Sequence, residues 1–373
     1  MNFKVSRMPL LNELNKVARA VSAKTPLPSL SGIKIEAKNN ALYFTGSDSD
    51  ISIHSSMVNT NDEFVLQILE EGSIVIGAKY ILEIVRKIES SEITIEVIDG
   101  ALIEIRGMSS EFKVNGLRVT DYPIIDFTKP EKSFFMDADQ LKRTINQTIF
   151  ATSDKETRPV LTGVNVKCEK NRIEFVATDS YRLARKIIDF PENFSFNVTI
   201  PAKSLNEVAR TIEKDTKIEI AVSDKKAQFW IDNTVIQTRL IEGAYPETSR
   251  LIPMNFDYEL VVDARDLLNA IDRASLMKND GINVVRLSMS SEKVELFSRS
   301  QEVGSVNEVM DEASFEGDAL NISFSGRYAM DAIKATSSSL VKVMFSGEMK
   351  PFIIRGVDDE QLVQLILPVR TYA

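Results

Sequence analysis

The feature that most constrains this chain is a segment that recurs at one fixed spacing. Residues 198–212 read VTIPAKSLNEVARTI, residues 74–88 read IVIGAKYILEIVRKI and residues 322–336 read ISFSGRYAMDAIKAT, each copy 124 positions from the next. The chain has 373 residues, which is three such periods plus one. A fixed internal period is the signature of a repeat architecture, so we predict three tandem domains built on one plan.

Each copy changes from a strand pattern to a helix pattern. Apolar residues alternate at the start, as at Ile74 and Ile76, and the 3.6-residue period of a helix follows. On each helix a base, an acid and a base recur at i, i+4 and i+7 and so share one face: Lys79, Glu83, Arg86; Lys203, Glu207, Arg210; Arg327, Asp331, Lys334. The opposite face is apolar, which predicts a helix lying on a sheet with a basic side outward. Ion pairs on a solvated face explain any one helix, but three copies favour a shared function.

The rest of each third follows the same plan. A strand and a helix open it and a hairpin follows, so we predict an α+β fold with two strand–helix–strands units in every third. Asp137 and Asp263 suit helix N-caps. The six helices are predicted at residues 7–24, 78–88, 138–149, 202–214, 264–278 and 326–337. Proline-containing connections at 121–133 and 244–258 are predicted linkers, which gives domains at 1–127, 128–252 and 253–373.

The charge is unevenly distributed along the chain. The net charge is −9, which argues against a simple basic nucleic-acid binder. The six predicted helices sum to +9, however, and the remainder to −18. A body that is basic on one side and acidic elsewhere would hold a polyanion on the basic side alone. No apolar run approaches the roughly 20 residues of a membrane span, and the single cysteine, Cys168, fits a reducing cytosol, so we expect a cytoplasmic protein without membrane contact.

No enzyme signature is present in the sequence. There is one histidine, His54, no glycine-rich phosphate loop and no cluster with metal-ligand spacing. Asp48 and Asp50 could hold a divalent cation, but Asp and Ser at a strand end are ordinary turn residues. The second repeat does carry an addition, ATDSYRLA at 177–184, where the first has neither an aromatic residue nor an arginine. That run is either core packing or an interface anchor.

Four stretches together carry a family resemblance. ATDSYRLA (177–184), LIEGAYPETSRLIP (240–253), LPSLSGIKI (27–35) and LILPVRTYA (365–373) resemble the β subunit of bacterial DNA polymerase III, the β sliding clamp, in the style of low-GC Gram-positive bacteria. The resemblance covers the whole chain. It implies a head-to-tail homodimer closed into a ring, with helices lining the hole and sheets outside. Such a ring encircles duplex DNA, slides without sequence preference and tethers the polymerase, with no catalytic residue, metal or cofactor.

The resemblance also implies three sets of site residues. The basic residues implied to lie near DNA are Lys24, Lys79, Arg86, Lys155, Arg158, Lys203, Arg210, Arg327 and Lys334. A partner-peptide cleft between the second and third domains is lined by Leu161, Thr178, Ser180, Tyr181, Arg182, Leu183, Pro246, Leu251, Leu365, Ile366, Leu367, Pro368, Val369 and Arg370. The dimer contact joins Phe112 and Val114 to Leu276 and Met277, and ordinary intradomain core is the alternative role for these residues.

The implied partners are duplex DNA, a second copy of the chain, the polymerase III catalytic subunit, the clamp loader, and replication and repair proteins with a short clamp-binding peptide. Many members have Gly-His where this chain has Ser180–Tyr181, which leaves the polar contacts of the cleft open. We further hypothesise that Glu83, Glu207 and Asp331 temper the basic helix faces so that contact with DNA stays mobile.

Two other classes compete with this interpretation. A metal-dependent nuclease would share the basic helices but needs clustered acids, which the sequence lacks. A repeat scaffold that binds only protein would explain the repeats, but not the base–acid–base order on all three helices. Metal-dependent cleavage would reveal the first class, and DNA retention that is unaffected by Lys and Arg replacement would reveal the second.

Overall fold

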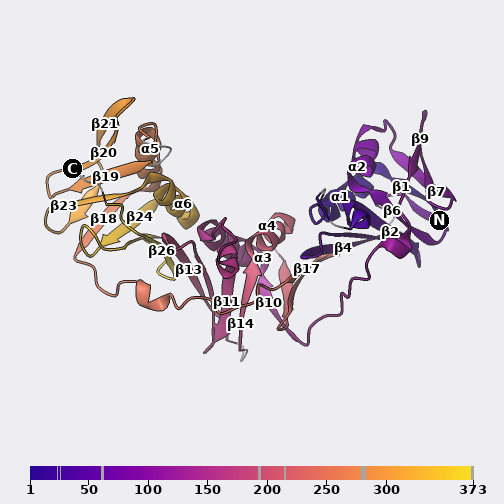
Figure 1. The fold of residues 1–373 in the computed structure, drawn as a ribbon, viewed down its shortest axis with the longest axis horizontal. Helices are drawn as coiled ribbons and strands as arrows, with labels where there is room; N and C mark the ends of the chain where they lie inside the picture. The colour runs from indigo at the N-terminus through magenta and orange to yellow at the C-terminus, as the bar shows by residue number, and fades with distance from the viewer. Residues whose placement is uncertain are drawn as a thin grey trace. The chain divides into compact units, whose positions relative to one another are not determined.

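The computed structural model describes residues 1–22, 24–25, 27–59, 63–191, 195–213, 216–278 and 283–370. Within these ranges the predicted plan of two strand–helix–strands units per repeat is confirmed (Figure 1). The first repeat comprises β1 (Asn2–Ser6), α1 (Arg7–Ala18), β2 (Gly32–Lys38), β3 (Ala41–Ser47), β4 (Ile51–Val58), β5 (Leu66–Glu70), β6 (Gly72–Gly77), α2 (Ala78–Lys87), β7 (Glu92–Asp99), β8 (Leu102–Gly107) and β9 (Ser110–Asn115).

The other two repeats follow the same plan, except that the described part of the second repeat has four strands between its helices where the first and third have five. The second comprises β10 (Lys132–Asp137), α3 (Ala138–Thr148), β11 (Gly163–Glu169), β12 (Arg172–Thr178), β13 (Arg182–Asp189), β14 (Phe196–Pro201), α4 (Ala202–Thr211), β15 (Lys217–Val222), β16 (Lys226–Ile231) and β17 (Thr234–Arg239). The third comprises β18 (Tyr258–Asp263), α5 (Ala264–Ala274), β19 (Val284–Met289), β20 (Val294–Ser300), β21 (Gly304–Val309), β22 (Ser314–Glu316), β23 (Leu320–Ser325), α6 (Gly326–Thr336), β24 (Leu340–Phe345), β25 (Phe352–Gly356) and β26 (Leu362–Ile366).

The chain divides into two compact units that share the middle repeat. The first unit is Met1–Leu141 with Glu207–Leu240, and the second is Lys142–Asn206 with Ile241–Ala373. The division cuts the middle repeat because its strands pair with both neighbours. In the first unit β17 pairs antiparallel with β4, and in the second unit β13 pairs antiparallel with β26. We call these pairings, with the turns and linkers beside them, the first joint and the second joint.

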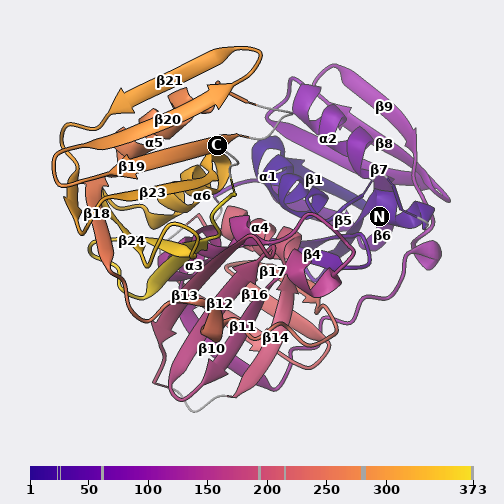
Figure 2. The ribbon, with the colours of Figure 1, turned by 60° about the vertical axis from the view of Figure 1, so that its left-hand side comes forward.

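Each unit contains two antiparallel sheets (Figure 2). In the first unit their strand orders are β5-β1-β7-β8-β9 and β10-β15-β16-β17-β4-β3-β2-β6. In the second unit they are β14-β11-β12-β13-β26-β25-β24-β18-β22 and β21-β20-β19-β23. The long sheet of each unit therefore runs through a joint, while β9 and β21 each end a short sheet as edge strands.

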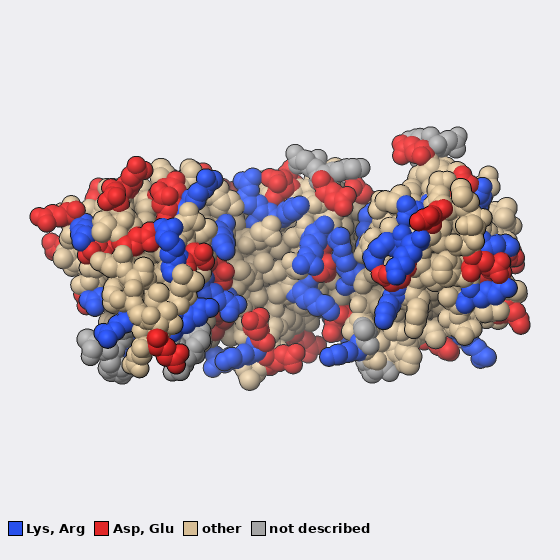
Figure 3. All heavy atoms as spheres, turned by 90° about the horizontal axis from the view of Figure 1, so that it is seen from above, with Lys and Arg blue, Asp and Glu red and all other residues tan. Residues whose placement is uncertain are grey.

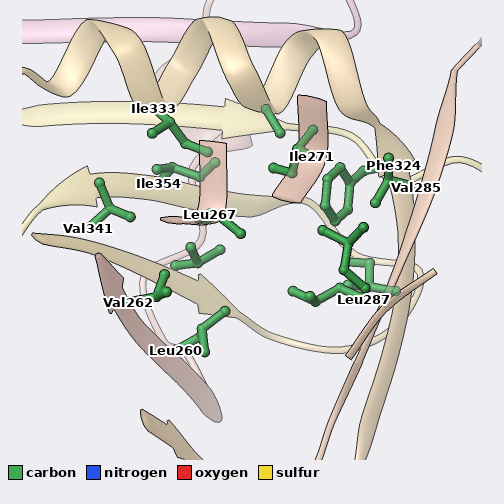
Figure 4. Packing of buried hydrophobic residues seen from close by; sticks show 14 of the residues in the cluster. Leu260, Val262, Leu267, Ile271, Val285, Leu287, Phe324, Ile333, Val341 and Ile354 are labelled. Carbon is green, nitrogen blue, oxygen red and sulfur yellow. The ribbon is translucent and has the colours of Figure 1, made fainter. Parts of the chain in front are cut away.

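Apolar helix faces close the cores between these sheets, as the periodicity predicts. In the third repeat Leu267 and Ile271 of α5 and Ile333 of α6 are buried against strand residues such as Val285 and Val341 (Figure 4). Fully burying one such side chain contributes about 1.5–3 kcal/mol. The corresponding faces of the other helices, for example Ile81 and Val85 on α2, are also buried.

The helix termini follow from local sequence. Asp263 accepts hydrogen bonds from the backbone N–H groups of Arg265 and Asp266, and Asp137 accepts one from Gln140, so both predicted N-caps are confirmed. The predicted 7–24 helix is too long, because α1 ends at Ala18. The Val21 N–H bonds to the Ala18 carbonyl, three residues back, as in a tight turn rather than a continuing α-helix.

Candidate DNA- and partner-binding surfaces

The nine lysine and arginine residues expected near DNA are all solvent-exposed. Six lie on the outer faces of α2, α4 and α6, opposite the buried apolar faces. The other three, Lys24, Lys155 and Arg158, lie in connections outside the helices. Figure 3 shows Lys and Arg side chains gathered in clusters on the face that it views, with Asp and Glu between them. Exposed lysine and arginine side chains of this kind attract phosphate groups without reading bases.

The acids in the repeated helix pattern differ in what they contact. Glu83 pairs with Arg86 and, at 3.4 Å, with Lys87, and Glu207 lies 3.4 Å from Arg210. Asp331 instead pairs with Arg182 of β13 at 2.6 Å. The hypothesis that all three acids temper their own helix faces is therefore incomplete, because Asp331 is engaged at the second joint. Sequence spacing gave no signal for this partner, which lies 149 positions away.

A tight turn at residues 178–182 forms the centre of the second joint. The Asp179 carboxylate accepts hydrogen bonds from the backbone N–H groups of Tyr181 and Arg182, at 2.9 and 3.0 Å. The Thr178 hydroxyl accepts from the Ser180 N–H and donates to the Arg182 carbonyl. Ser180 is left-handed, with φ 77°. The turn thus fixes Tyr181 outward, and 60% of this side chain is exposed.

Arg182 is buried at the base of that turn. Its guanidinium contacts Asp179 at 3.0 Å and Asp331 at 2.6 Å, and it lies over the rings of Tyr328 and Phe150, 4.5 and 5.3 Å from the centroids. Only 7% of Arg182 is exposed to solvent. The two carboxylates and the two aromatic faces therefore replace water as partners of the planar guanidinium cation. Arg182 therefore fastens the turn to α6, and sequence reasoning placed it only as a lining residue.

The residues expected to line the partner cleft differ in exposure. Leu161, Thr178, Leu183, Leu365 and Ile366 are buried. The more accessible members are Ser180, Tyr181, Pro246, Leu251, Leu367, Pro368, Val369 and Arg370. Accessible aliphatic and aromatic groups next to buried apolar ones can bind a short peptide with apolar anchors. Thr371–Ala373 lie outside the described residues.

The first joint repeats the turn of the second joint bond for bond. Asp48 accepts from the backbone N–H groups of Asp50 and Ile51, and the Ser47 hydroxyl accepts from Ser49 and donates to the Ile51 carbonyl. Ser49 is left-handed, with φ 84°. The Asp48–Ser49–Asp50 stretch is thus a structural turn, and among the described residues no group of three or more His, Cys, Asp or Glu side chains could hold a metal ion.

A tyrosine of the following linker bonds to each joint, and Tyr122 is buried whereas Tyr245 is partly buried. The Tyr245 hydroxyl accepts a hydrogen bond from the Thr178 N–H at 3.1 Å, and the Tyr122 hydroxyl donates to the Thr45 carbonyl at 3.2 Å. Burial raises the pKa of both phenols above the ordinary value. The predicted linkers are therefore strapped to the joints and are not free connections.

His54 lies on β4 beside the first joint. Its Nδ1 is 3.0 Å from the Thr45 hydroxyl, and its ring stacks on Tyr43 and tilts against Phe127. Burial lowers the pKa of the His54 imidazole. These contacts give the single histidine a packing role.

The expected dimer residues lie on accessible surface. Phe112 and Val114 belong to the edge strand β9, and Leu276 and Met277 follow the end of α5. Leu276 is 70% exposed and Phe112 36%. Val114 and Met277 are half-buried, so none of the four is fully buried. No helix in the described ranges is long and apolar enough to cross a membrane.

Repeated strand–helix–strands units, joined into long sheets and carrying bases on the outer helix faces, define the class of DNA clamps. Profiles described as the N-terminal, central and C-terminal domains of the DNA polymerase III beta subunit match residues 1–126, 136–247 and 249–370. The beta sliding clamp of Bacillus subtilis is 42% identical over the full length of both chains, and that of Staphylococcus aureus (strain Mu50) is 40% identical over the same share.

Solved structures agree with the sequence comparisons. The DNA polymerase sliding clamp from Bacillus subtilis has a TM-score of 0.95 at 41% identity, with both chains fully covered. The DNA polymerase III beta chain from Streptococcus pneumoniae has a TM-score of 0.94 at 33% identity, with 99% and 100% covered. The chain belongs to the DNA polymerase III beta subunit (beta sliding clamp) family. It is a processivity factor of DNA replication and a non-catalytic subunit, which the resemblance predicted.

Proposed function

We propose that two copies of this chain close head to tail into a ring that encircles duplex DNA and carries the polymerase along it. The observation that carries this proposal is the strand pairing at the joints. The fourth strand of the first repeat, β4, pairs with the last strand of the second, β17. The fourth strand of the second repeat, β13, pairs with the last strand of the third, β26.

If the fourth strand of each repeat pairs with the last strand of the next repeat, one fourth strand and one last strand remain without a partner. The fourth strand of the third repeat is β21 and the last strand of the first repeat is β9, and both are edges. The β9 strand of a second copy can pair with β21 of the first, and the β21 strand of the second copy can pair with β9 of the first. All four edge strands of the dimer are then paired. Covering an edge in this way also removes a site for uncontrolled aggregation. The exposed Phe112 on β9 and Leu276 after α5 would then become buried apolar contacts.

The proposed contact with DNA uses the nine exposed lysine and arginine side chains. They would draw phosphate oxygens by releasing condensed counterions, without base-edge contacts, so that the ring slides. The acids Glu83 and Glu207, each paired on its own helix, would keep that attraction weak. A nuclease would need a metal, and a protein-only scaffold would not need bases on the three repeated helices.

The proposed partner surface is the second joint, with Tyr181 and Leu251 as accessible anchors. Short peptides of the polymerase III catalytic subunit, the clamp loader, and replication and repair proteins would bind there in turn. Because the work is done on the bacterial chromosome, the proposed location is the cytoplasm. The domain limits 1–127, 128–252 and 253–373 also stay a proposal.

Retention on DNA tests the ring directly. The chain is loaded onto nicked circular DNA with a clamp loader and ATP, washed in high salt, and then the circle is cut once. High salt removes electrostatic binders but cannot release a closed ring. We expect the protein to survive the wash and leave after the cut. Equal loss from circular and linear DNA would overturn the proposal.

Matched variants separate the dimer from the DNA contact. Phe112→Asp on β9 should abolish both the dimer mass in solution and retention, whereas Phe135→Asp, at an exposed phenylalanine on the edge strand β10, should keep both. Replacing Lys203 and Arg210 with Gln should keep the dimer and weaken loading. A Phe112→Asp variant that dimerises normally would refute the proposed edge pairing.

A further inference from the structure

The first joint contains a groove that no role described above uses. It has a volume of about 730 Å³ and lies within the first unit, between the turn at Ser49 and Asp50, the linker at 123–126, the β15–β16 turn at 223–226 and the end of β17. The turn and the strand pair beside it match those of the second joint, where the partner surface is proposed. The repeat has therefore built the same framework twice.

The side chains on the two frameworks have opposite character. The Arg239 N–H bonds to the Asp50 carbonyl as the Leu367 N–H bonds to the Tyr181 carbonyl, which fixes the correspondence. Tyr181 and Leu367 at the second joint thus correspond to the charged residues Asp50 and Arg239 at the first joint. On the linker the exchange is reversed, because the fully exposed Ile124 follows Pro123 where Glu247 follows Pro246.

The groove also contains exposed charged side chains that have no partner within the described chain. Lys226 pairs with Asp126 at 3.4 Å. Among the described residues, the side chains of Arg239, Lys225, Asp50 and Asp224 form no hydrogen bond or ion pair. Two cations and two anions, with Ile124 and Leu27 as exposed apolar surface, form a groove of mixed charge with an aliphatic contact.

We propose that this groove binds an extended peptide segment of another protein, one that carries an aliphatic side chain flanked by an acidic and a basic residue. The aliphatic group would contact Ile124, the acid would bind Arg239 and Lys225, and the base would bind Asp50. Mixed charge disfavours nucleic acid, because Asp50 and Asp224 repel phosphate. A chain with two such grooves of different chemistry can hold two partners at once without competition between them.

The test selects ligands for this groove alone. A displayed library of short random peptides is panned on the full chain carrying Tyr181→Asp, which disables the proposed surface at the second joint. Selected peptides are then measured by fluorescence anisotropy on the unmodified chain. We expect peptides that combine an aliphatic, an acidic and a basic residue. Arg239→Glu should weaken them at least about tenfold, and Lys38→Glu, at an exposed lysine elsewhere in the first unit, should not.

A charge exchange makes the test specific. Replacing the peptide's acid with lysine should abolish binding to the unmodified chain and restore it to the Arg239→Glu chain. No selected peptide, equal binding to the Arg239→Glu chain, or selection of purely apolar peptides would overturn the proposal, as would tighter capture of a DNA oligonucleotide than of any peptide. Arg239→Glu should leave ring retention on DNA and peptide binding at the second joint unchanged, so failure here is distinct from failure of the proposed ring.

Discussion

The first and second joints show how one backbone framework can present two different surfaces. Their turns share the same hydrogen bonds, and their strands pair in the same register. At four equivalent positions one joint is polar and the other apolar: Asp50, Ser52, Gln237 and Arg239 against Tyr181, Leu183, Leu365 and Leu367. Backbone hydrogen bonds and buried neighbours fix the framework, so the outward side chains can diverge without changing the fold.

The joints also differ in how they are fastened to a helix. At the second joint Arg182 binds Asp331 of α6. The equivalent residues at the first joint are Ile51, which is buried and apolar, and Glu207, whose Oε2 is buried without a hydrogen-bond partner among the described residues. The second joint therefore depends on an ion pair where the first depends on apolar packing.

Replacing the ion pair of the second joint with the apolar residue of the first should have the largest effect on stability. Arg182→Ile, which introduces the residue of the first joint, leaves Asp179 and Asp331 uncompensated beside a poorly solvated site. We expect the free energy of unfolding to fall by about 3 kcal/mol, measured by denaturant unfolding. Adding Asp331→Leu should recover part of that loss because it removes one stranded charge. Arg182→Ile with unchanged stability would show that the pair does not fasten the joint.

The next effect separates binding from stability. Tyr181→Asp gives the second joint the residue of the first at an exposed position. We expect binding of a short apolar clamp-binding peptide to weaken about tenfold, because loss of an aromatic anchor costs at least about 1–2 kcal/mol. The melting temperature should not change. Asp50→Tyr is the matched control, and it should leave this peptide's affinity as it was; an affinity unaffected by Tyr181→Asp would remove Tyr181 from the surface.

A smaller difference concerns the phenols of Tyr122 and Tyr245. Tyr245→Phe removes the acceptor of the Thr178 N–H, and Tyr122→Phe removes a donor to the Thr45 carbonyl. We expect each to cost about 1 kcal/mol, with Tyr245→Phe at least as costly, because a carbonyl tolerates an unmet bond better than an N–H does. Thermal melts of the two variants check the order, and a reversed order would contradict this reasoning.

The phenols also predict a dependence on pH. Their folded-state pKa values are raised, so their contribution to stability is complete below the unfolded value of about 10 and is lost as pH rises above it. In alkaline unfolding the double Tyr→Phe variant should lose less stability between neutral pH and pH above 10 than the unmodified chain. Parallel curves would show that the phenols are solvated.

The sequence predicted the parts of this comparison that repeat and missed the parts that cross between repeats. The 124-residue period, the apolar helix faces and the Asp caps follow from local patterns, and the structure confirms them. The pairing of Arg182 with Asp331 is not local, since nothing in the spacing of two charged residues so far apart indicates contact. The polar groove at the first joint was missed for a related reason, because its residues come from three distant segments.

The smallest effect concerns the position that is His54 at the first joint and Arg185 at the second. Burial lowers the pKa of His54, with Glu36 opposing and Lys34 reinforcing the shift. Its contribution to stability is therefore present above the unfolded pKa of 6.5 and is lost as pH falls below it through the folded value. The second joint has Arg185 at the equivalent position and so has no imidazole there. As the only histidine, His54 can be titrated by proton NMR, and His54→Gln should abolish the mild acid destabilisation. A folded-state pKa at or above 6.5 would show that the ring is not desolvated by Tyr43 and Phe127.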